Sequence, residues 1–326
     1  MKGLTALELV REDLAQVEAK MHQTAEDAYA PLGQAFTMLL ESGGKRLRPA
    51  MAILAARFHP CDQNKLTSLA AALETLHTAT LVHDDVIDGS LLRRGHPTLN
   101  ASWNQGATVL AGDYLFARAA GFAAETEDVR VIQLFSQTLM TICDGELRQL
   151  FAMQRWEQPK EEYYRRIYAK TASLFAAATE SGAVLSEAPE PEIIALRDYG
   201  RYFGMAFQIV DDILDFVGDE KVMGKPAGSD LRQGTVTLPV FYFMRDNPHA
   251  DQLRQILKRI THRGEDGAHA AAEAVSLIRN SDAIEAARRE ALDFVAQAKE
   301  SLTILPNTPY RAALAELADH VVHRSL

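Results

Sequence analysis

The chain has little cysteine, fewer basic than acidic residues, and no long uninterrupted apolar run. Two cysteines, Cys61 and Cys143, in 326 residues make no disulfide framework, which favours a reducing, cytoplasmic setting. Lys and Arg total 34 against 44 Asp and Glu, and a net charge of −10 argues against nucleic acid as the main partner. We expect no transmembrane segment and no signal peptide, because the apolar runs are too short and acidic residues occur early in the chain.

Helical periodicity dominates the sequence. Apolar residues recur at three- and four-residue intervals, which predicts helices over residues 4–28, 64–88, 107–124, 128–153, 160–186, 190–217, 283–303 and 309–323. The apolar stretch 235–240 contains Pro239 and is interpreted as the start of a buried helix rather than a strand. Gly and Pro fall between these segments and no long linker is present. We therefore expect one all-α domain over residues 1–326, with about ten or more mostly antiparallel helices.

An Asp-Asp-x-x-Asp run occurs twice, at residues 84–88 and 211–215, each time after an apolar helical segment. Carboxylates four residues apart share one helix face and repel each other unless cations lie between them. One run alone could equally be a set of acidic cap residues. Two runs in apolar helices favour two walls of one cavity that binds a hard divalent cation such as Mg²⁺, which is commonly held by carboxylates together with substrate phosphates.

Basic residues occur in short motifs that suit a diphosphate. The turn 43–49 (Gly-Gly-Lys-Arg-Leu-Arg-Pro) carries three cations before a helix start, and Arg93-Arg94 follows the first acidic run. Lys170-Thr171 lies in an apolar helical segment, and Lys225 lies in a second Gly-rich loop that lacks the spacing of a P-loop. Each motif taken alone is also compatible with ordinary solvated cations. The sequence contains no His-Glu-x-x-His, Cys-x-x-Cys or Gly-x-Ser-x-Gly motif, which argues against those metal, redox and hydrolase chemistries.

In their order along the chain, these motifs resemble those of the trans-polyprenyl diphosphate synthases, of the long-chain type. The resemblance covers about residues 40 to 240, and residues 317–324 look like the last helix of the family. It rests on Gly43–Pro49, His77, Asp84–Asp88 with Arg93-Arg94-Gly95, Lys170-Thr171, Gln208 with Asp211–Asp215, and Gly224-Lys225.

The resemblance implies an isoprenoid-synthase fold, with helices around a deep central cavity, and a prenyltransferase that adds isopentenyl diphosphate to an allylic diphosphate. It implies Mg²⁺ as cofactor, three ions with substrate bound, with Asp84, Asp88 and Asp211 as metal ligands. Asp85, Asp212 and Asp215 would support these ligands and, with Lys170, complete the catalytic set. The allylic diphosphate would be bound by Arg93, Lys170, Thr171, Gln208 and Lys225, and isopentenyl diphosphate by Lys45, Arg48, His77 and Arg94.

Product length is expected to depend on the residues one turn before Asp84. Ala79 and Thr80 are small there, whereas short-chain relatives tend to have a bulky floor, so a hexa- to nonaprenyl product is expected. The small pair could instead only let two helices approach closely. A deeper floor could come from Phe116, Phe122 or Phe135. Thr235 gives a second indication, since many short-chain relatives carry lysine at this position.

Three alternatives remain open from the sequence. The chain could be a short-chain farnesyl or geranylgeranyl diphosphate synthase, or the catalytic subunit of a heteromeric long-chain synthase. A class I terpene cyclase is disfavoured because it normally carries an Asn/Ser/Glu-type triad in place of the second acidic run and has no use for the 43–49 loop. A homodimer is the expected assembly, and a heteromer with a small subunit is the alternative.

Overall fold

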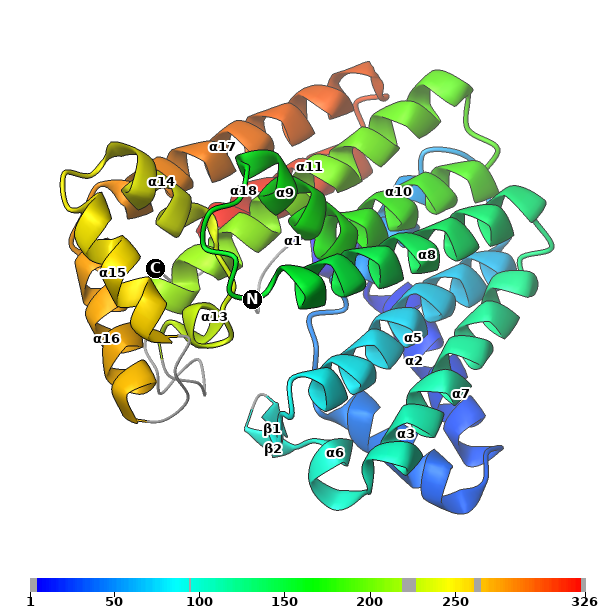
Figure 1. Cartoon of the computed structure of the whole chain (residues 1–326). Helices are drawn as coiled ribbons and strands as arrows, with labels where there is room; N and C mark the ends of the chain where they lie inside the picture. The colour runs from blue at the N-terminus through cyan, green and yellow to red at the C-terminus, as the bar shows by residue number, and fades with distance from the viewer. Residues whose placement is uncertain (1–4, 94, 219–226, 261–264, 324–326) are drawn as a thin grey trace. The chain divides into compact units, whose positions relative to one another are not determined.

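The computed structural model describes residues 5–93, 95–218, 227–260 and 265–323, and helices dominate these ranges (Figure 1). The strands assigned in the described residues form one short antiparallel hairpin of β1 (Leu92–Arg93) and β2 (His96–Pro97). The prediction of an all-α protein is confirmed. None of the described helices combines the length and the apolar character needed to cross a membrane.

Contacts divide the chain into two compact units, each built from several stretches of sequence. The first unit comprises residues 1–138, 174–198 and 302–317, and the second comprises residues 139–173, 199–301 and 318–326. One consequence is that α8 (Val129–Ala152) and α11 (Glu190–Val217) each begin in the first unit and end in the second.

The first unit is organised around α5 (Gln63–Ile87), which packs against its neighbours along most of its length. Nearly every α5 residue from Leu66 to Ala79 is buried, as expected for a helix that is covered on all sides. The helices in contact with it include α2 (Arg11–Glu26), α4 (Leu47–Ala56), α6 (Leu99–Ser102) and α7 (Gln105–Ala124), and α7 runs beside it in Figure 1. The unit also contains α1 (Thr5–Leu9), α3 (Ala30–Glu41), most of α10 (Ser173–Leu185), η2 (Leu302–Ile304) and most of α18 (Pro309–Val322).

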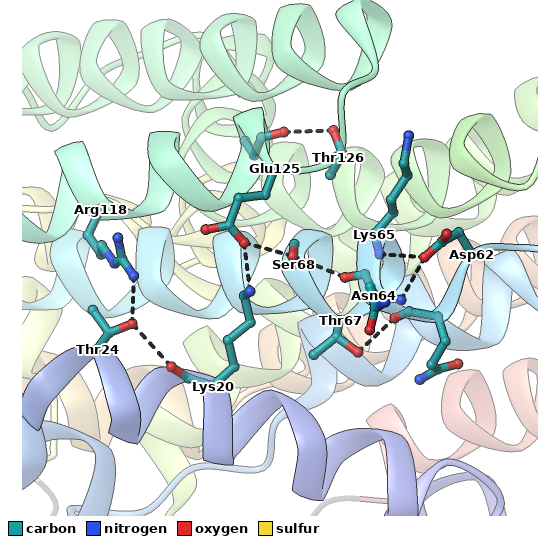
Figure 2. Close-up of polar contacts among 12 residues, drawn as sticks. Lys20, Thr24, Asp62, Asn64, Lys65, Thr67, Ser68, Arg118, Glu125 and Thr126 are labelled. Atoms are coloured by element: carbon teal, nitrogen blue, oxygen red, sulfur yellow. Dashed lines mark hydrogen bonds and ion pairs between the residues drawn. The ribbon is translucent and has the colours of Figure 1, made fainter. Parts of the chain in front are cut away.

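Polar contacts hold the N-terminal half of α5 in place (Figure 2). The Asp62 carboxylate caps the helix by accepting hydrogen bonds from the backbone N–H groups of Asn64 and Lys65. The Glu125 carboxylate at the end of α7 accepts from Ser68 of α5 at 2.9 Å and pairs with Lys20 of α2 at 2.6 Å. One carboxylate thus joins α2, α5 and α7 near the N-terminal end of α5.

The second unit contains the C-terminal parts of α8 and α11 and most of the remaining helices. Its core is a cluster of buried apolar side chains that includes Phe216, Leu231, Val240 and Phe243. Within it, α15 (Ala250–Ile260) buries residues 253, 256, 257 and 260, the spacing of one helix face. The other elements among its described residues are α9 (Lys160–Ile167), η1 (Tyr168–Ala172), α13 (Ser229–Arg232), α14 (Leu238–Asp246), α16 (Glu265–Arg279) and α17 (Ala283–Ser301).

The predicted helices agree with the structure to within a few residues at most ends. The segment 160–186 differs, because it comprises α9, the π-helix η1 and α10 in direct succession. The interpretation of residues 235–240 is confirmed in its main point, since α14 begins at Leu238 with Thr237 as its N-cap.

Candidate active site

The first acidic run lies at the C-terminal end of α5. Asp84 is half-buried, Asp85 is buried, and Asp88 is the exposed C-cap residue whose backbone N–H donates to the Asp84 carbonyl. This is the negative end of the helix dipole, and the last turn of α5 holds no basic residue. Acidic cap residues belong at the opposite end of a helix, so the cap interpretation of this run does not fit.

Asp85 faces the protein rather than solvent. Its Oδ1 accepts a hydrogen bond from Arg93 Nε at 2.8 Å, and its backbone carbonyl accepts from the Asn100 side chain. Burial raises the pKa of Asp85, while the charge and the hydrogen bond of Arg93 lower it. Arg93, predicted to bind the allylic diphosphate, is therefore tied by this ion pair to the helix that carries the first acidic run.

In the basic loop before α4, Arg46 is paired with carboxylates of the protein. Arg46 turns inward with positive φ, and its guanidinium donates to Glu74 at 2.9 Å, to Glu18 at 3.0 Å and to the Leu40 carbonyl at 2.8 Å. Burial lowers the pKa of Arg46, but Glu74 and Glu18 outweigh it and raise the pKa overall. The Arg46–Glu74 pair attaches the loop to α5 one turn before His77. Sequence reasoning missed Glu74, although a glutamate among alanines and leucines in an apolar helix was a usable signal.

The predicted isopentenyl diphosphate ligands in the described residues all belong to the first unit. Lys45 is exposed in the loop, Arg48 is half-buried in the first turn of α4, and His77 is half-buried on α5. The Arg48 guanidinium lies 4.4 Å from the centre of the Phe175 ring, a cation–π contact that fixes this side chain. Arg94, the fourth predicted ligand, lies outside the described residues, as does Lys225 from the allylic set.

The second acidic run lies in the last two turns of α11, again with no basic residue in the final turn. Asp211 is half-buried, whereas Asp212 and Asp215 are buried. Asp215 Oδ2 accepts a hydrogen bond from the Asp230 backbone N–H at 3.1 Å, which joins α11 to the start of α13. The run thus presents Asp211 more openly than the two aspartates that follow it.

Asp212 is held by two neutral donors. Its Oδ1 accepts from Gln208 Nε2 and its Oδ2 from the Tyr163 hydroxyl, both at 2.8 Å. Burial and then the charge of Asp230 raise the pKa of Asp212 to about 7, while Gln208, Arg166 and Tyr163 act in the opposite direction. Tyr163 was missed in the sequence, because nothing in a tyrosine pair on a polar helix indicates which ring is buried.

Lys170 and Thr171 lie within the π-helix η1, a widened turn of the kind often found at functional sites. Lys170 Nζ pairs with Glu146 of α8 at 2.8 Å, so a carboxylate offsets the charge of this half-buried lysine. The Thr171 hydroxyl donates to Gln208 Oε1 at 2.6 Å. The structure therefore joins Thr171, Gln208 and Asp212 in one series of hydrogen bonds within the second unit.

The donor set fits a hard divalent cation. Each run offers carboxylate oxygens at a negative helix end, and Mg²⁺ needs only one or two of them together with substrate phosphates. In the ranges that the structure describes, no group of three or more His, Cys, Asp or Glu side chains forms a metal site of its own. Whether carboxylates of the two runs share one metal site therefore stays a prediction from the sequence.

Ala79 is fully buried on α5, and Thr80 is half-buried, with its hydroxyl donating to the His77 carbonyl at 2.7 Å. Thr80 shares a helix face with Leu76, Leu73 and Leu69, which line an apolar cavity of about 10 Å³. Phe135 of α8 lines the same cavity. Phe116 packs against the His83 ring, and Phe122 lies beneath Arg118, so Phe135 is the candidate floor residue that this cavity favours.

Comparison with known proteins identifies the family. The family model described as polyprenyl synthetase matches residues 29–277. The chain belongs to the polyprenyl synthetase family. Over 99% of both chains it is 41% identical to heptaprenyl diphosphate synthase component 2 of Geobacillus stearothermophilus.

Solved structures of polyprenyl synthetases agree with this assignment. The structure of heptaprenyl diphosphate synthase from Staphylococcus aureus superimposes with a TM-score of 0.92 at 36% identity, covering 97% of this chain and 99% of that one. The polyprenyl synthase of Caulobacter crescentus CB15, complexed with calcium and isoprenyl diphosphate, superimposes at 0.89 with 37% identity, covering 98% and 97%. The chain therefore has the all-α isoprenoid-synthase fold and is a prenyltransferase, in a family that generally depends on a divalent metal.

Proposed function

We propose that this polyprenyl synthetase joins isopentenyl diphosphate to an allylic diphosphate and repeats the addition to give a long-chain, all-trans polyprenyl diphosphate in the hexa- to nonaprenyl range. The observation that carries the proposal is the pair of acidic runs, each at the negative end of a helix and each with its second aspartate held by protein donors. The names of the Geobacillus and Staphylococcus relatives, both heptaprenyl diphosphate synthases, support the product class.

In this reaction the bond between the allylic carbon and its diphosphate oxygen breaks, and the isopentenyl double bond forms the new carbon–carbon bond. A proton then passes to the departing diphosphate, so the mechanism requires no protein base. When bound, Mg²⁺ offsets the negative charge that develops on the leaving diphosphate. We assign Asp84, Asp88 and Asp211 as its ligands, with three ions in the substrate complex.

The assignment of unequal roles within each run is supported by burial. Asp84 and Asp211 are half-buried and Asp88 is exposed, whereas Asp85 and Asp212 are buried against protein donors. The half-buried and exposed aspartates can reach a bound metal ion, and the buried ones can orient them. Lys170, Thr171, Gln208, Arg93 and Lys225 are proposed to bind the allylic diphosphate, and Lys45, Arg48, His77 and Arg94 the isopentenyl diphosphate.

The product is proposed to grow from the acidic run along the Thr80 face of α5. The face continues into the apolar cavity between Leu69, Leu73, Leu76 and Phe135. At about 10 Å³ the cavity holds no more than one water, so its side chains must rotate to admit a prenyl chain. An apolar lining also keeps water from the allylic cation, which water would otherwise trap.

A second copy of this chain is the proposed partner. The part of α8 in the second unit exposes Met140, Cys143, Leu147, Leu150 and Phe151. Their spacing places most of them on one helix face, and exposed apolar stripes of this kind mark contact surfaces. Because the chain carries both acidic runs, it needs no other subunit to supply metal ligands. The name "component 2" in the Geobacillus relative makes a heteromer the alternative.

The test is an elongation assay on the protein purified alone. Farnesyl diphosphate and labelled isopentenyl diphosphate are supplied with Mg²⁺, product length is read from the dephosphorylated alcohols, and sedimentation of the same sample gives its mass. Long-chain alcohols from a dimer would support the whole proposal. Short-chain products would support the farnesyl or geranylgeranyl alternative, and a silent monomer would support a heteromer with a small subunit.

A further inference from the structure

Two consecutive tyrosines on α9 donate their hydroxyl groups to different carboxylates. The Tyr163 hydroxyl donates to Asp212 Oδ2 at 2.8 Å, and the Tyr164 hydroxyl donates to Glu290 of α17. Tyr163 is fully buried and Tyr164 is half-buried. The Tyr163 hydroxyl is thus directed at the second acidic run, whereas the Tyr164 hydroxyl is directed at α17, which carries neither run.

Both carboxylate oxygens of Asp212 accept hydrogen bonds from protein side chains. Gln208 Nε2 donates to Oδ1, and Gln208 is itself oriented because its Oε1 accepts from the Thr171 hydroxyl at 2.6 Å. The series Thr171–Gln208–Asp212–Tyr163 therefore joins η1, α11 and α9. Since a buried carboxylate oxygen that loses its donor is costly, each of these bonds restricts the Asp212 rotamer.

Tyr163 is itself held tightly. Its ring packs edge-on against Phe241 at 5.9 Å between centroids, and the Arg166 guanidinium lies 5.4 Å from its centre. Arg166 in turn donates to the Val236 carbonyl just before α14. The hydroxyl group is therefore placed by the core of the second unit, so that Asp212 accepts from a rigid donor.

We propose that Tyr163 is a positioning residue for the second acidic run. Its hydroxyl and the Gln208 amide fix Asp212, and through the shared turn of α11 they fix the direction in which Asp211 presents its carboxylate to metal and diphosphate. Thr171 and Gln208 act in the same series and have this role in addition to any contact with substrate. The inference rests on the proposed function, because Asp211 is a metal ligand only in that reaction.

Tyr163→Phe and Tyr164→Phe form a matched pair for the test. Each removes one hydroxyl that donates to a carboxylate on another helix, and each keeps the aromatic ring. Three quantities are measured for both variants and the wild type: the Mg²⁺ concentration that gives half-maximal elongation, calorimetric binding of Mg²⁺ together with inorganic pyrophosphate, and the midpoint of thermal unfolding.

Tyr163→Phe is expected to weaken Mg²⁺ binding about 10-fold or more by both measurements, the effect typical of losing a residue that orients a metal ligand. Tyr164→Phe is expected to stay within about twofold of wild type, at a similar unfolding midpoint. Equal Mg²⁺ responses in the two variants would overturn the inference. If Tyr163→Phe does not fold, Phe241→Leu replaces it, because it loosens the packing of the Tyr163 ring without changing a proposed ligand. A smaller shift is expected in the same direction, and no shift would count against the proposal.

The result also separates this inference from the proposed function. A wild-type protein that does not elongate on its own would overturn the proposed function as a homodimeric synthase, while the calorimetric comparison would still decide the role of Tyr163. A wild type that elongates, with Tyr163→Phe unchanged in its Mg²⁺ response, would overturn the positioning role alone.

Discussion

Residues at the same position of the two acidic runs differ in their hydrogen-bond donors or in their burial, although the motif is identical. Asp85 and Asp212 hold the same position in Asp-Asp-x-x-Asp, yet Asp85 accepts from a cationic donor, Arg93, and Asp212 accepts from two neutral ones. The last residues differ too, since Asp88 is exposed and Asp215 is buried. The motif predicts which residues are candidates, but the neighbouring helices decide which carboxylates remain accessible.

The Arg46–Glu74 pair should dominate the stability of the basic loop. The Arg46 side chain is 14% exposed and that of Glu74 is 6% exposed, so Arg46→Ala would leave a buried carboxylate without its cation. We expect a loss of about 3–5 kcal/mol in the free energy of unfolding. Arg11→Ala is the control, because its pair with Glu8 is exposed and should change that free energy by less than about 1 kcal/mol. Chemical denaturation of both variants measures the difference, and similar losses would contradict the prediction.

At the level of whole elements, periodicity predicted the long helices well. Helices such as α5 and α11 lie within one residue of their predicted ends, because their apolar spacing is sustained over many turns. Short elements were predicted less well: α4 was expected only as a helix start after the basic turn, and α13 was not predicted. The hairpin of β1 and β2 has too few residues to show alternation. The π-helix η1 could not be foreseen either, since the apolar spacing of residues 160–186 is that of a continuous helix.

Gly145 on α8 allows the close approach of α8 to η1. A Cβ atom at Gly145 would lie 2.4 Å from the Cβ of Ala169, the residue before Lys170. Gly145→Ala should therefore force the two elements apart and lower the free energy of unfolding by about 1–3 kcal/mol. Gly121 of α7 provides the control, because a Cβ there meets no atom within 4 Å. Gly121→Ala should stabilise the protein by about 0.5–1 kcal/mol. Thermal unfolding of both variants tests the pair, and effects of the same sign would refute this account of Gly145.

At the scale of the whole molecule, the sequence identified the chemistry better than the supporting contacts. The metal-binding and diphosphate-binding candidates lie in short motifs, and their roles, which the family resemblance implies, stay predictions. Their contacts differ in how far the sequence reveals them. Glu74 lies close to His77 and could have been noticed as a glutamate in an apolar helix, whereas the contacts of Glu146 and Tyr163 could be recognised only from the folded chain. The candidate floor residues could not be ranked for the same reason, because three phenylalanines look alike until one of them lines the cavity.

The length of the prenyl product should depend on residues on both sides of the apolar cavity. Thr80→Phe places a ring on the face that leads from Asp84 to Leu76, where Thr80 is only half-buried, so the product should shorten by several isoprene units. Ala79→Phe should act in the same direction, at an additional cost of about 1–3 kcal/mol in stability because Ala79 is fully buried. Phe135→Ala removes a ring from the far side of the cavity and should lengthen the product. Chromatography of the prenyl alcohols from the three variants and the wild type makes the comparison. An unchanged product with both Thr80→Phe and Ala79→Phe would show that the prenyl chain does not grow along this face of α5. If only Phe135→Ala changed the product, by lengthening it, Phe135 would be the floor, and the chain would reach it along another helix.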